Sequence, residues 1–157
     1  MTDELQKKIV WQNINSSKEK GKILKGKIIA IETEKMKLES IVCAIIDFYG
    51  IKVLIPATEI SKEFNNDKKL LRNMMGAEIR FIIVEADRIS EKAVGSRIKA
   101  MERLNEINMK KIVVGDKIYA QIVGLWKKYI RVECLGIDYI IKAKDLQYRY
   151  IDDFSSI

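Results

Sequence analysis

Two stretches of the chain repeat one β-type segment, and this repeat limits the folds open to the sequence more than any other feature. Residues 50–60 (GIKVLIPATEI) and residues 136–146 (GIDYIIKAKDL) share Gly, Ile, Ile and Ala at matching positions, 86 residues apart. Upstream, residues 27–30 (KIIA) match residues 117–120 (KIYA) with a shift of 90, and a longer first hairpin around residues 33–40 accounts for the difference. We therefore expect two copies of one small β unit, joined by a helix.

The residues around the repeat predict a mainly β chain with two helices. Thr2 is a typical N-cap and Gly21 a typical C-cap, so a helix is expected over residues 3–20. A second helix is expected over residues 97–110. Pro56, the only proline, should end the pairing of the third strand. Runs rich in β-branched residues predict strands over residues 22–33, 38–48, 51–57, 77–87, 92–97, 117–125, 129–136 and 137–143.

The order of these segments predicts tandem five-stranded OB-fold barrels, the second of them truncated. Five strands with a turn or helical piece after the third, around residues 59–71, are typical of the OB topology, and barrel closure removes exposed strand edges. The second unit reaches only three strands and a polar tail, so we expect it to be incomplete. The expected domains are an N-terminal helix (1–21), a first OB domain (22–97), a linker helix (98–111) and a partial second OB domain (112–157).

Composition excludes several classes of protein. The 157 residues include 29 Lys and Arg against 22 Asp and Glu, a net charge of +7, and 48% are hydrophobic, which is typical of a soluble globular chain. No apolar run is long enough to predict a membrane span, and the polar start (MTDELQKK) does not predict a signal peptide. The only two cysteines, Cys43 and Cys134, fall in apolar strands, so we expect core thiols in a reduced, cytoplasmic protein.

The residue inventory also argues against an enzyme. The chain contains no histidine, which removes histidine-based acid–base catalysis, Ser-His-Asp and Cys-His nucleophiles, and most zinc sites. Residues 21–27 spell G-x-x-x-x-G-K, but Ile28 follows where a phosphate-binding loop has Ser or Thr. We therefore expect a non-enzymatic protein with no catalytic residues, no metal and no cofactor.

The repeated unit resembles the RNA-binding domain of ribosomal protein S-one. Residues 114–118 (VGDKI) look like the opening run of that family, and residues 126–130 (WKKYI) stand where the family has Phe-Gly-Ala-Phe-Val. In the first copy, residues 93–97 (AVGSR) look like the family's closing strand. The resemblance covers about residues 10–150. It implies OB barrels that bind RNA, with a link to translation or the ribosome.

The second copy carries the residue types that RNA binding needs. Single-stranded nucleic acid is bound by aromatic rings that stack on bases and by cations that follow the phosphates. Trp126 and Tyr129 flank two lysines, whereas the first copy has Glu-Lys-Met-Lys at residues 34–37. The family's frequent histidine is Lys142 here and Pro56 in the first copy. The candidate RNA-binding residues are Trp126, Lys127, Lys128, Tyr129, Arg131, Tyr139, Lys142, Lys144 and Arg149.

Alternatives stay open for several of these residues. Period-two alternation places Tyr129 and Arg131 on one face of a strand, opposite the core-facing Ile130 and Val132. The aromatic pair fits a stacking platform or a cap on the end of the barrel, and Tyr139 fits either role. In the first copy, secondary phosphate contacts or ordinary surface lysines are expected at Lys25, Lys27 and Lys52.

Two functions from different classes are consistent with this sequence. The first is non-catalytic binding of single-stranded RNA, weak, salt-dependent and tolerant of sequence. The second is a structural or protein-interaction module, because an incomplete barrel leaves an open sheet edge that accepts a strand from a protein partner or from another copy of the chain. No membrane partner is expected from either.

Overall fold

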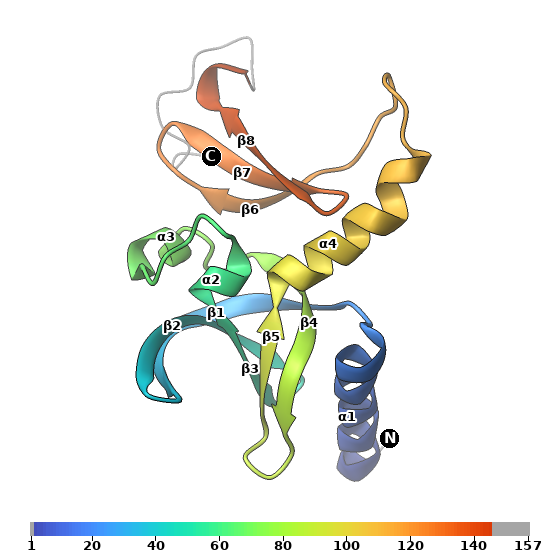
Figure 1. The fold of residues 1–157 in the computed structure, drawn as a ribbon, viewed down its shortest axis with the longest axis vertical. Helices are drawn as coiled ribbons and strands as arrows, with labels where there is room; N and C mark the ends of the chain where they lie inside the picture. The colour runs from blue at the N-terminus through green and yellow to red at the C-terminus, as the bar shows by residue number, and fades with distance from the viewer. Residues whose placement is uncertain (1, 146–157) are drawn as a thin grey trace. The chain divides into compact units, whose positions relative to one another are not determined.

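The computed structural model describes residues 2–145, and Figure 1 shows their fold. The chain is mainly β, with a five-stranded closed barrel and a separate three-stranded sheet. Its contacts divide it into two compact units, Met1–Ala100 and Met101–Ile157. We call these the first and the second unit. Within the described residues, no helix combines the length and the apolar character that crossing a membrane requires.

The N-terminal helix α1 (Asp3–Lys20) has the predicted start and end. The Thr2 hydroxyl accepts a hydrogen bond from the Leu5 N–H, and Gly21 ends the helix in the left-handed conformation, with a φ of 71°. The helix is fixed to the barrel by Ser17, which is fully buried and whose hydroxyl accepts a 2.9 Å hydrogen bond from the N–H of Ile83. This bond satisfies a buried backbone donor beside a register shift in the barrel.

Five strands form the barrel of the first unit in the order β1-β2-β3-β5-β4, and β4 pairs with β1 to close it. The β3–β5 pairing is parallel and the other pairings are antiparallel. The strands are β1 (Leu24–Met36), β2 (Glu39–Phe48), β3 (Ile51–Pro56), β4 (Glu78–Asp87) and β5 (Lys92–Ser96). Two short helices, α2 (Ala57–Ile60) and α3 (Lys68–Arg72), lie between β3 and β4 in the sequence, as Figure 1 shows.

Strand β1 is shared between two neighbours, and this sharing lets five strands close. Its first residues, Leu24 to Lys27, pair with β4, and the residues from Ile28 on pair with β2, with a register shift between Ile28 and Ala30. Gly26 lies at the crowded crossing, because a side chain there would overlap the fully buried Ile46 and approach the ring of Phe81. Gly26 therefore lets β1 pack closely against Ile46 and Phe81, two residues of the barrel core.

The second unit contains a three-stranded antiparallel sheet in the order β6-β7-β8. Residues 117–120, predicted as the start of β6, are not in a strand. The described part of this unit has no strand that pairs with them, and an extended segment without a neighbour leaves its backbone groups unsatisfied. The elements are α4 (Arg97–Asn108), which begins in the first unit, η1 (Met109–Lys111), β6 (Gln121–Leu125), β7 (Tyr129–Cys134), β8 (Ile137–Lys142) and η2 (Ala143–Asp145).

Candidate nucleic-acid interface

A tight turn between β6 and β7 exposes two adjacent lysines. The Trp126 N–H donates a 3.0 Å hydrogen bond to the Tyr129 carbonyl, which leaves Lys127 and Lys128 as the turn. The Ala143 N–H donates a 2.9 Å hydrogen bond to the Lys128 carbonyl, so the end of β8 is tied to the same turn. Both lysines are exposed. The turn therefore presents two cations next to two aromatic residues.

The two aromatic rings stack on each other. The ring centroids of Trp126 and Tyr129 lie 5.1 Å apart with an interplanar angle of 9°, and both side chains are half-buried. The indole also lies over Gly124, where an added Cβ would overlap its six-membered ring. Glycine at this position therefore lets the indole lie close to β6, with Tyr129 stacked on it.

Two further lysines belong to the same end of the sheet. Lys142 is the register partner of Tyr129, so both side chains point to one face, and Lys142 is exposed. Lys144 is exposed and follows Ala143, whose N–H is bonded to the turn. We call the resulting set the aromatic–lysine cluster; its members are Trp126, Lys127, Lys128, Tyr129, Lys142 and Lys144.

Two predicted RNA contacts do not join this cluster. Arg131 is 5% exposed, and its Nη1 atom lies 3.2 Å from a carboxylate oxygen of Asp138. Tyr139 is the register partner of Val132, which places it on the opposite face of the sheet from Tyr129. Arg131, which was expected to be accessible, is therefore buried in an ion pair with Asp138. Tyr139 lies on the face of the sheet opposite the cluster. Arg149 lies outside the described residues.

The first unit offers a weaker set of cations than the sequence predicted. Lys25 and Lys27 are exposed on β1. The Lys52 ammonium lies 2.7 Å from a carboxylate oxygen of Glu32 and 3.1 Å from one of Glu34. The hydrogen bond from Lys52 lowers the pKa of Glu32, and the same bond raises the pKa of Lys52. Lys52 therefore neutralises carboxylates of its own barrel, which favours the ordinary surface lysine over the phosphate contact among its two expected roles.

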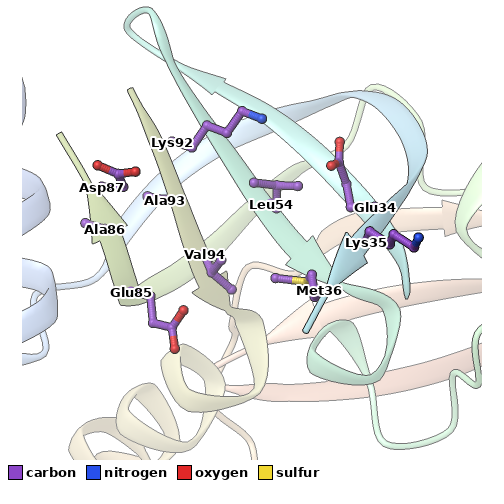
Figure 2. Close-up of a pocket in the computed structure, with 10 residues that line it drawn as sticks. All are labelled: Glu34, Lys35, Met36, Leu54, Glu85, Ala86, Asp87, Lys92, Ala93 and Val94. Atoms are coloured by element: carbon purple, nitrogen blue, oxygen red, sulfur yellow. The ribbon is translucent and has the colours of Figure 1, made fainter. Parts of the chain in front are cut away.

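A pocket of about 270 Å³ on the first barrel was not predicted, because its residues come from four strands and share no sequence motif. Figure 2 shows Leu54 between Glu34, Lys35 and Met36 of β1 and the residues of β4 and β5. Three carboxylates and two lysines line it, and no aromatic residue does. The lining residues are Glu34, Lys35, Met36, Leu54, Glu85, Ala86, Asp87, Lys92, Ala93 and Val94. This pocket therefore lacks the stacking rings that the second unit has.

Cys43 lies in a small apolar cluster with Ile45 and Leu54, close to this pocket. Burial raises the pKa of the Cys43 thiol from 9.0 to about 11, because the thiolate is poorly solvated there. Since the folded state favours the neutral thiol, we expect its contribution to stability to be intact below pH 9 and to fall as the pH rises from 9 to 11. Urea unfolding across this pH range checks this against Cys43→Ala, which should lose less stability over the same interval. Equal losses in the two proteins contradict the prediction.

Comparison with known proteins adds no assignment. No protein-family model matches the chain, and no curated protein matches it. Over residues 2–145, no group of three His, Cys, Asp or Glu side chains is placed to hold a metal ion. The function is therefore argued from the geometry of the aromatic–lysine cluster.

Proposed function

We propose that this chain binds single-stranded RNA without catalysing a reaction, and that the aromatic–lysine cluster is the binding surface. The observation that carries the proposal is the parallel Trp126–Tyr129 stack beside the exposed lysine turn. A base can continue an existing aromatic stack, and every base has a flat face, so such binding tolerates many sequences. The neighbouring ammonium groups then follow the phosphates.

The topology of the first unit supports an OB-type barrel. Its strand order, its closure through β1 and β4, and the helices between β3 and β4 favour that fold. OB barrels host many functions, so this likeness alone does not choose RNA as the ligand. The resemblance to the S-one family extends the proposal to RNA and, through it, to translation.

The strand registers support a second copy of the same unit. Cys43 pairs with Pro56 and Tyr129 pairs with Lys142, each 86 residues further along, and all six register pairs of β7 and β8 follow those of β2 and β3 with this shift. The turns also correspond, because Gly50 and Gly136 both have a positive φ, of 93° and 87°. We therefore treat β6, β7 and β8 as counterparts of β1, β2 and β3.

The counterparts explain why we assign RNA binding to the second unit alone. The register shifts of β1 and β6 correspond when Ile28 is matched with Ile122, a shift of 94 residues. With these matches, Glu32 corresponds to Trp126 and Cys43 to Tyr129. One face of the repeated unit thus has a carboxylate and a thiol in the first copy, where the second copy has the two stacked rings.

Fluorescence anisotropy with a labelled single-stranded RNA of mixed sequence tests the proposal. We expect Trp126→Ala/Tyr129→Ala to weaken binding at least tenfold, because each stacked base contributes about 1–3 kcal/mol. Tyr119→Ala is the matched control, since Tyr119 is a fully exposed aromatic in the same unit and outside the cluster. Circular dichroism establishes that each variant is folded.

The salt dependence supplies a second readout. Lys127→Ala/Lys128→Ala should make the negative slope of log K against log[salt] shallower by about 1.4, because each lost phosphate contact on a single strand contributes about 0.7 to its magnitude. Lys110→Ala/Lys111→Ala, at two exposed lysines of η1, should leave the slope unchanged. Absence of RNA binding at low salt, or equal losses in the Tyr119→Ala control, contradicts the proposal.

A further inference from the structure

One face of the three-stranded sheet is apolar and only partly covered. Its residues alternate with those of the cluster face, and none of those described is charged. Ile130 and Val132 at its centre are buried, with Ile141 packed against them, whereas Ile122 is 51% and Tyr139 is 48% exposed. The described residues of this face are Ile122, Leu125, Ile130, Val132, Cys134, Ile137, Tyr139 and Ile141.

The counterpart face in the first unit is the inside of a closed barrel. Ile28, the counterpart of Ile122, is 1% exposed, and Val53, the counterpart of Tyr139, is 0% exposed. Strands β4 and β5 close the first barrel beside them and bring in Phe81. The described part of the second unit has no such strands. Its apolar face therefore resembles a barrel interior in composition, but Ile122 and Tyr139 are about half exposed, as apolar residues at an interface are.

The edge of this sheet is complementary to itself. Among the described strands, β8 pairs only with β7, so no described strand covers its outer edge. If two β8 strands pair antiparallel about Ile140, Asp138 of each copy, which also keeps its ion pair with Arg131, faces Lys142 of the other. In the same register, Tyr139 faces Ile141 on the apolar side. Opposite charges and apolar pairs directly across an antiparallel ladder stabilise it.

We propose that a second copy of this chain covers the apolar face, with the two β8 strands paired antiparallel about Ile140. A twofold interface needs one surface that fits itself, and this register supplies two Asp138–Lys142 pairs. In such a pair the two apolar faces lie on the same side of one six-stranded sheet, and the coiling that β-sheets adopt turns them toward a shared core. This inference does not rest on RNA binding, because Tyr139 lies on the face opposite the cluster residue Tyr129, although Lys142 belongs both to the cluster and to the paired edge.

Light scattering coupled to size-exclusion chromatography tests the proposal on the full chain, from micromolar to near-millimolar concentration. We expect a dimer whose dissociation constant rises at least about 100-fold in Tyr139→Lys, because the variant buries an unpaired ammonium. Tyr119→Lys is the matched control, since Tyr119 is fully exposed and lies outside the sheet. It should leave the dimer unchanged.

Two further variants separate a changed interface from a misfolded chain. Ile122→Lys, on β6, should weaken the dimer as Tyr139→Lys does, and circular dichroism should be unchanged in both. Lys142→Asp should weaken it at least tenfold, because it sets two carboxylates against each other at the edge. A wild-type monomer at every concentration overturns the proposal, and so does a dimer that tolerates both Tyr139→Lys and Ile122→Lys. RNA anisotropy on Tyr139→Lys keeps the two proposals apart, because that variant retains the whole cluster.

Discussion

Replacing Phe81 by alanine should lower the free energy of unfolding of the first unit by about 3–5 kcal/mol. The Phe81 side chain is fully buried and lies edge-to-face with Phe48, with ring centroids 5.9 Å apart. Two glycines flank its ring, since an added Cβ would lie 3.6 Å from it at Gly26 and 3.2 Å from it at Gly95. Because the glycines have no side chains to fill the space, truncation leaves a cavity that the barrel cannot easily close.

The two tryptophans allow this loss to be assigned to one unit. Trp11 is 4% exposed and belongs to the first unit, while Trp126 belongs to the second. In a Trp126→Phe background, the urea-induced change in fluorescence therefore reports the first unit alone. Ile29→Ala is the control, because Ile29 is 54% exposed on β1 and its truncation should cost less than about 1 kcal/mol. If Phe81→Ala lowers the free energy of unfolding by no more than the Ile29→Ala control does, Phe81 does not organise the core.

The sequence predicted the elements of the first unit well because their signals are local. Thr2 and Gly21 mark the ends of α1 by the chemistry of their own backbone and side chain. The dense β-branched runs mark the strands, and Pro56 marks the end of β3. Each signal acts within a few residues, so it can be read without knowing the fold.

The candidate site was predicted less completely, because strand register is a long-range property. The sequence matched residues 27–30 with residues 117–120, but the register shifts of β1 and β6 match Ile28 with Ile122. Similar Lys-Ile runs in both segments favour the first match, whereas the strand registers favour the second one under the proposed repeat. Register depends on bulges and neighbouring strands, which leave little trace in the sequence.

The partners of charged side chains were likewise beyond the sequence. Arg131 forms its ion pair with Asp138 across the β7–β8 ladder, and Lys52 of β3 reaches two glutamates of β1. A lysine or arginine in a strand predicts a cation, but only the fold decides whether a carboxylate already neutralises it. Lys127 and Lys128 differ from these two residues, because they form a turn between strands and do not lie within a strand ladder. The turn is therefore the part of the candidate site that sequence reasoning could place.

Gly136→Ala should lower the free energy of unfolding of the second unit by about 2–4 kcal/mol, against about 1 kcal/mol for Gly50→Ala in the first unit. Both glycines have a positive φ at the second position of corresponding turns, so both variants incur the backbone strain of alanine. No atom lies within 4 Å of a Cβ added at Gly50. At Gly136, the same atom would overlap the Met101 carbonyl oxygen and the backbone of Asn105 in α4.

The difference between the two variants isolates the packing of α4 on the β7–β8 turn. Backbone atoms of a helix cannot rotate away as a side chain can, so the turn and α4 must separate in Gly136→Ala. Trp126 fluorescence in a Trp11→Phe background reports the second unit, and Trp11 fluorescence in the Trp126→Phe background reports the first. Equal losses at the two glycines would mean that φ strain is the whole cost and that α4 does not hold the turn. Because the cluster lies at the opposite end of this hairpin, RNA binding by folded Gly136→Ala should stay within about threefold of the wild type, the size of effect expected when no contact is removed.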